Sequence, residues 1–204
     1  MTFCPESGQP SVDVYTLADL KRDPFFWPRH GAFVDAHPRV EVWKPYLIKK
    51  RLAALADGAS LLYLDAGWRL SGDVAPLVAR LPTENIIGLA ANQPEGDCTK
   101  MDVLLKLRAL PLAATTQLLT SAILLYVCPA TRRLVNRWYA LACDYHYVDD
   151  SPSVQRDLPD FRQHQDRALF SLLAKTHGLL SPLSLADKVD GADAVGRTEV
   201  DHDL

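Results

Sequence analysis

The chain has 204 residues, of which 48% are hydrophobic and 23% are charged, and its formal net charge at pH 7 is -3. This length suits one domain with a sizeable core, and the apolar content excludes an intrinsically disordered chain. The small acidic excess argues against a nucleic-acid-binding protein, because neutralising a run of phosphates requires a surplus of Lys and Arg.

Cysteine spacing and hydropathy bear on the compartment. The four cysteines are widely spaced and form no C-x-x-C motif, which favours a reducing compartment and gives no zinc site: Cys4, Cys98, Cys128 and Cys143. No basic and apolar leader opens the sequence, and no apolar stretch approaches the roughly 18 residues that cross a bilayer. We therefore expect a soluble cytoplasmic protein with at most peripheral membrane association.

The N-terminal part carries short signals. Apolar patterns predict strands at residues 1–3 and 11–15, and Thr16 is predicted to cap a helix that runs through Lys21. An aromatic, proline-punctuated stretch follows at residues 25–30. These aromatic side chains either belong to the core or stack on a sugar or a base.

Residues 42–68 contain the clearest unit of the chain. A proline opens residues 45–56, where apolar positions recur at helical spacing, and the Asp-Gly pair at 57–58 ends this predicted helix. The apolar run at 61–64 then predicts a strand buried on both faces, as in a mostly parallel sheet. Asp65 follows at once, so a carboxylate stands at the carboxyl end of a buried strand.

Two readings of Asp65 are open. Ligands of α/β sheets bind outside the carboxyl ends of the strands, and Mg²⁺ or Mn²⁺ needs only one or two carboxylates when substrate phosphates complete its shell. Alternatively, Asp65 caps the turn that follows the strand. The nearby basic cluster either binds a small phosphorylated ligand or forms a solvated helix face: Lys44, Lys49, Lys50 and Arg51.

The rest of the chain alternates helices and strands. We expect strands at 85–90 and 121–127, a loop at 92–97, a surface loop at 148–162, and helices at 73–80, 100–108, 132–145 and 163–177. This alternation predicts one α/β domain over residues 1–186, with a mostly parallel central sheet flanked by helices. Residues 187–204 are expected to form a polar tail with a short strand at 194–195.

A second candidate carboxylate, Asp166, opens the last long helix. Near a helix N-terminus it either only stabilises the helix dipole or serves as a general base for an acceptor hydroxyl.

Five motifs occur in a fixed order. They are W-K-P-Y-L-I from Trp43, Y-L-D-A-G from Tyr63, T-K-M-D from Thr99, T-Q-L-L-T-S-A-I-L-L from Thr116 and H-Q-D-R-A-L-F-S-L-L from His164. Together they resemble the GT-A-type nucleotide-diphospho-sugar transferases of bacterial and viral glycan-synthesis clusters, over residues 40–180.

This resemblance implies a GT-A, Rossmann-like fold and a glycosyltransferase. Its donor would be a nucleotide-diphospho-sugar, its acceptor a hydroxyl of a glycan or glycolipid, and hexosyl or deoxyhexosyl transfer is expected. Asp65 would hold Mn²⁺ or Mg²⁺ against the donor diphosphate, with Gly67 where the common motif has its second carboxylate. Asp166 would be the catalytic base.

The resemblance also implies further contacts to the donor or to the cleft. The residues concerned are Lys44, Ala66, Gly67, Thr116, Gln117 and Gln165. His202 is either a late metal ligand or an exposed, inert side chain.

An alternative hypothesis is a domain of the same fold that has no catalytic activity. Only about forty residues precede W-K-P, so the chain could be a catalytically silent sugar-nucleotide or glycan-binding domain. A serine hydrolase built on Ser121 or Ser171 is disfavoured because neither serine lies in a G-x-S-x-G turn.

Overall fold

The computed structural model describes residues 2–3, 11–158 and 165–190. One five-stranded sheet runs through it, in the order β1 (Thr2–Phe3), β2 (Ser60–Leu64), β5 (Thr116–Tyr126), β4 (Ile86–Pro94) and β6 (Leu180–Ser184). Every neighbouring pair is antiparallel except β4 and β6, which are parallel. The architecture is thus mixed α/β, and the prediction of a mostly parallel sheet is wrong.

The physical reason for this error lies in burial. Strands β2 and β5 are apolar on both faces because helices cover one face and a second layer covers the other. Continuous apolar runs report burial on both faces, which is typical of parallel sheets but does not itself fix strand direction.

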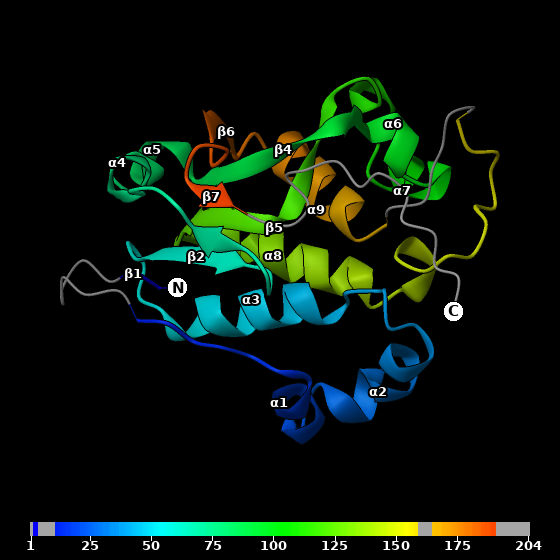
Figure 1. Ribbon diagram of the computed structural model, residues 1–204. Coiled ribbons are helices and arrows are strands. Elements are labelled where there is room, and N and C mark those ends of the chain that lie inside the picture. The colour runs from blue at the N-terminus through cyan, green and yellow to red at the C-terminus, as the bar shows by residue number, and fades with distance from the viewer. Residues whose placement is uncertain (1, 4–10, 159–164, 191–204) are drawn as a thin grey trace, which may run out of the picture.

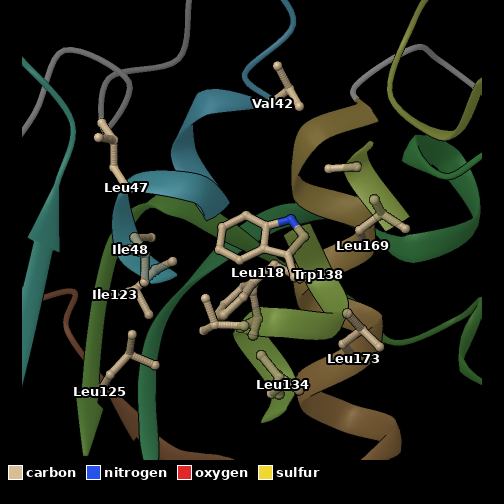
Figure 2. Packing of buried hydrophobic residues seen from close by; sticks show 14 of the residues in the cluster. Val42, Leu47, Ile48, Leu118, Ile123, Leu125, Leu134, Trp138, Leu169 and Leu173 are labelled. Carbon is tan, nitrogen blue, oxygen red and sulfur yellow. The ribbon is translucent and has the colours of Figure 1, made fainter. Parts of the chain in front are cut away.

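Three helices cover one face of the sheet (Figure 1): α3 (Trp43–Ala54), α8 (Pro129–Ala142) and α9 (Gln165–Thr176). The main core fills the space between them and the sheet. Trp138 of α8 is buried at its centre and its ring lies 4.9 Å from that of Phe170, between centroids. Figure 2 shows Trp138 surrounded by apolar side chains from α3, α8, α9 and β5.

A smaller core covers the opposite face. It lies under α4 (Ala75–Val78), α5 (Leu81–Glu84) and the two-stranded pair of β3 (Arg69–Leu70) with β7 (Val189–Asp190). Strand alternation assigns the side chains, since Leu61 and Ile123 belong to the main core whereas Leu62 and Leu124 belong to the smaller one.

Shorter helices complete the described chain: α1 (Leu17–Arg22), α2 (Trp27–Ala36), α6 (Glu95–Cys98), α7 (Met101–Lys106), η1 (Leu110–Leu112) and η2 (Tyr145–Tyr147). Thr16 and Asp19 form a capping box at the start of α1, as the predicted cap requires. None of the helices in these described ranges has the length and hydropathy of a membrane span.

Several predicted elements need correction. Residues 11–16, which we call the N-terminal strap, pass along α3 toward α1 (Figure 1). They form no strand beyond a bridge at Ser11, and all of them are exposed, so their alternation does not mark a buried sheet face. The aromatic stretch at 25–30 leads into α2, which was not predicted. The predicted loop at 92–97 is the end of β4 followed by α6.

The C-terminal part also differs from expectation. Strand β6 was not predicted, and β7 uses the first residues of the predicted polar tail. The strand expected at 194–195 lies outside the described residues.

Candidate functional site

Asp65 stands where β2 ends. Its N–H donates to the carbonyl of Ser121 at 2.9 Å, which extends the pairing of β2 with β5 by one residue. The following turn is closed by the backbone, since the N–H of Trp68 donates to the carbonyl of Asp65. The carboxylate itself turns elsewhere: the Tyr63 hydroxyl donates to Oδ1, and the Lys44 ammonium donates to Oδ2 at 3.1 Å.

The Lys44 ammonium is enclosed by oxygen atoms. Only 1% of its side chain is exposed, and it pairs with Glu41 as well as with Asp65. It also donates to the hydroxyl of Thr120 at 3.2 Å. Because a buried ammonium is stable only with such partners, these groups fix the side chains of both Lys44 and Asp65.

A pocket of about 360 Å³ opens beside Asp65, between the strap, α3 and β2. The Asp65 side chain is 22% exposed and forms part of its lining. Four aromatic residues also line it: Tyr15, Trp43, Tyr63 and Trp68. Aromatic faces combined with a few fixed polar groups are typical of sites that bind a base or a sugar.

The charges around this pocket are largely paired. Arg51 and Asp13, which both line it, form an ion pair with Nε and Oδ2 at 2.9 Å. Counting the group around Lys44, three carboxylates face two cations here. The electrostatic attraction of a diphosphate to these side chains is therefore weak unless a further cation binds with it.

These contacts leave little room for the predicted metal ion. A divalent ion at Oδ2 of Asp65 would lie against the Lys44 ammonium, and like charges repel. Within the described ranges no group of three or more His, Cys, Asp or Glu side chains converges. As arranged, the described residues do not fit Mn²⁺ or Mg²⁺. His202, the other expected ligand, lies outside the described residues. The metal therefore stays a prediction.

The other residues of the D-A-G stretch have different positions. Ala66 lines the pocket with Asp65. Gly67 has a φ of 92°, a backbone conformation that favours glycine, so its place in the motif has a conformational reason.

Thr116 and Gln117 lie at the start of β5, away from this pocket. Gln117 is fully buried and its side-chain amide donates to Glu95 at 3.3 Å. Glu95 is buried too and pairs with Lys175 of α9 at 2.6 Å, while Lys175 also contacts the carbonyl of Thr116. Gln117 thus belongs to a buried polar cluster that joins α6 to α9, whereas Thr116 is exposed and contributes only its carbonyl.

Gln165 and Asp166 are the first two residues of α9, but their side chains lie outside the described part of the structure. Their predicted roles therefore stay predictions.

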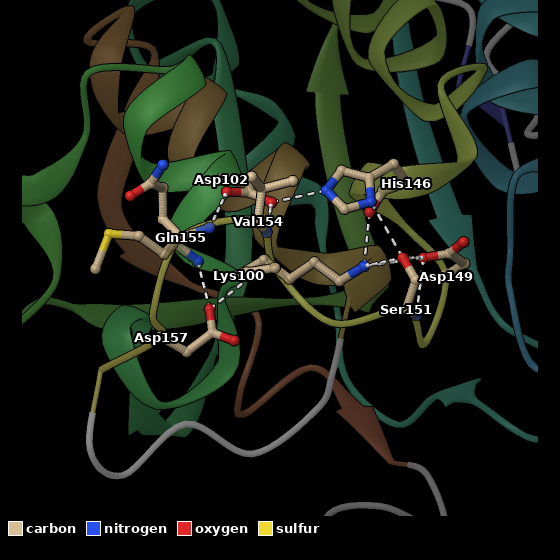
Figure 3. A network of polar contacts seen from close by, with 10 residues as sticks. Lys100, Asp102, His146, Asp149, Ser151, Val154, Gln155 and Asp157 are labelled. Carbon is tan, nitrogen blue, oxygen red and sulfur yellow. Dashed lines mark hydrogen bonds and ion pairs between the residues drawn. The ribbon is translucent and has the colours of Figure 1, made fainter.

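The T-K-M-D motif forms a third polar group (Figure 3). Lys100 is fully buried and donates to Asp149 at 2.9 Å and to the carbonyl of His146 at 2.6 Å. Asp102 accepts from the backbone N–H of Val154 and contacts Nε2 of His146 at 2.7 Å. Although burial opposes it, these hydrogen bonds keep the pKa of Asp102 below its usual value.

This third group has a structural consequence. Its contacts attach residues 149–157 to the start of α7, and this segment leads along the chain toward α9. The T-K-M-D motif thus holds residues 149–157 against the start of α7.

Sequence reasoning missed several residues of the site. Glu41 and Thr120 complete the surroundings of Lys44, and Tyr15 and Trp68 shape the pocket. Only Glu41 carries a local signal, because it stands three residues before Lys44, a spacing at which side chains meet on a helix.

Comparison of the chain with family models, curated proteins and solved structures finds no match.

Proposed function

We propose that this protein is a glycosyltransferase of GT-A type that acts in the cytoplasm. It would move a sugar from a nucleotide-diphosphate donor to a hydroxyl of a glycan or glycolipid. The observation that supports the proposal most is the position of Asp65, at the end of buried β2, in a pocket of about 360 Å³ with four aromatic residues in its lining.

The pocket offers the contacts that a nucleoside or a sugar needs. A base or a sugar ring packs on Tyr15, Trp43 or Trp68. A carboxylate has about four acceptor positions, so Asp65 retains acceptor capacity for ligand hydroxyls after binding Tyr63 and Lys44. In this role Tyr63 and Lys44 hold the carboxylate in one orientation.

Asp166 is the proposed base. A carboxylate in the first turn of a helix is stabilised in its ionised form, which is the form that accepts a proton from an attacking hydroxyl. We derive no step through a metal, because the described contacts of Asp65 do not fit one.

The test is release of nucleoside diphosphate. The protein is incubated with a panel of sugar nucleotides, with and without Mn²⁺, and slow hydrolysis is followed. We expect one donor to be hydrolysed and Asp65→Asn to abolish the release, whereas the control Asp187→Asn, at an exposed position, keeps it. Equal rates in wild type and Asp65→Asn would disprove the role of Asp65.

A catalytically silent binding domain is the second candidate. It is favoured by the paired charges around the pocket, which neutralise Lys44 and Arg51 before a diphosphate arrives. A donor that raises the melting temperature but is never hydrolysed, even with added acceptors, would identify this alternative.

A further inference from the structure

A second pocket, of about 330 Å³, adjoins the first. Tyr15, Trp43 and Leu47 line both pockets, so the two meet at a shared wall. The remaining lining comes from α1, α2 and their flanking residues: Thr16, Leu17, Leu20, Val34, Asp35 and Pro38. Most of these side chains are apolar.

The N-terminal strap exposes apolar side chains at this junction. Eight large hydrophobic residues are strongly exposed in the described chain, and four of them fall between residues 12 and 17: Val12 (60%), Val14 (78%), Tyr15 (42%) and Leu17 (52%). All four line one or both pockets. Exposed apolar surface that is concentrated at pocket mouths marks a binding site for an apolar group.

The charged side chains around the two pockets limit which kind of apolar ligand can bind. Asp35 is the one charged residue among the described side chains that line the second pocket, and carboxylates outnumber cations around the first. A fatty acid or another anionic amphiphile would meet like charge on both sides. A neutral amphiphile would not.

We propose that the second pocket binds the apolar chain of a neutral glycolipid acceptor. The acceptor sugar would pack on Tyr15 and Trp43 at the shared wall, with its hydroxyls facing the first pocket, and the donor would then pack on Trp68. This assignment rests on the proposed transferase function, which places the donor in the first pocket. It specifies the acceptor as lipid-linked rather than as a free polar glycan.

The probes are hexyl, octyl and decyl glucoside, each below its critical micelle concentration, with binding to the full chain measured by calorimetry. We expect each added methylene group to tighten binding by about fourfold, as burial of a CH₂ group predicts. Decanoate should bind more weakly than decyl glucoside because of Asp35.

Two matched variants test where the alkyl chain of the glucoside binds. Leu17→Asp places a charge in the second pocket, and α1 should still form because an acidic residue is favourable in the first turn of a helix. It should remove the dependence on chain length. Val154→Asp, at a position that is 82% exposed and lines neither pocket, should leave that dependence unchanged.

The outcomes separate this inference from the proposed function. Affinity that is independent of chain length, equal binding of decanoate, or an unchanged series in Leu17→Asp would overturn it. So would binding to phosphatidylcholine vesicles without binding of monomeric glucosides, which would make the strap a membrane contact. Donor hydrolysis without a chain-length effect overturns this inference alone, whereas the reverse result overturns the transferase function and keeps the apolar pocket.

Discussion

The ammonium of Lys44 lies 3.1 Å from Oδ2 of Asp65 and pairs with Glu41 at the same time, although the Lys44 side chain is almost completely buried. One cation thus holds together the start of α3 and the end of β2. The contact both orients the candidate carboxylate of Asp65 and stabilises the fold, so a substitution of Lys44 should affect the site and the stability together.

We expect Lys44→Met to destabilise the protein by about 2 kcal/mol, because Glu41 and Asp65 would lose their shared cation. This value lies below that for a fully buried pair, since both carboxylates are partly exposed and water screens them. Urea unfolding at neutral pH measures the loss. Lys106→Met, at an exposed position of α7, should change stability by less than about 0.5 kcal/mol, and an equal loss in both variants would contradict the prediction.

His30 predicts a dependence of stability on pH. Burial, together with the charge of Arg29, lowers the pKa of His30 to about 4. In the unfolded chain His30 takes up a proton near pH 6.5, whereas in the folded protein it stays neutral. The full stability is therefore present above pH 6.5, and part of it is lost as the pH falls toward 4. The expected loss is on the order of 2 kcal/mol.

This loss is measured by unfolding at intervals between those two pH values. His30→Gln should flatten the slope, because Gln takes up no proton. His177→Gln, at an exposed histidine, should keep it. A wild-type profile that is flat in this window would refute the role of His30.

Asp23 predicts a second effect, at lower pH. Burial opposes its ionisation, but hydrogen bonds from Lys50, Tyr46 and the N–H groups of Phe25 and Phe26 hold the pKa of Asp23 far below its usual value. Its contribution is therefore present above the unfolded pKa of about 4 and is lost as the pH falls through the folded pKa.

Asp23→Asn is expected to cost about 2 kcal/mol at pH 7 and clearly less at pH 3. Unfolding free energies at these two pH values provide the measurement. Because Asp23 connects α2 to Tyr46 and Lys50 of α3, the same variant should loosen the second pocket and weaken decyl glucoside binding. A cost that is equal at both pH values would show that its charge does not matter.

Asp102 tests the attachment of the segment before α9. In Asp102→Asn the N–H groups of Val154 and Gln155 lose a charged acceptor, and their hydrogen exchange should accelerate by on the order of tenfold. Amides of β5 should keep their protection, because Asp102 does not contact that strand. Unchanged exchange at Val154 would show that other contacts hold the segment.

The sequence alone placed the central unit of this protein. Helical spacing and the turn at 57–58 predicted α3, and the apolar run at 61–64 predicted β2 with Asp65 at its end. These features follow from local rules, since periodicity, turn residues and burial on both faces act within a few positions. The cap at Thr16 was predicted for the same reason, although its reciprocal contact with Asp19 was not.

Other features were decided by tertiary structure. Strand direction, the path of the strap, the burial of Gln117 beside Glu95 and the convergence of Glu41, Asp65 and Thr120 on Lys44 all join residues that are distant in sequence or not patterned. Such contacts depend on how helices and strands pack against one another, and packing leaves little trace in local periodicity. Position in the chain therefore indicated which carboxylate to consider, and only the packed fold showed that Asp65 contacts the Lys44 ammonium and lines a pocket.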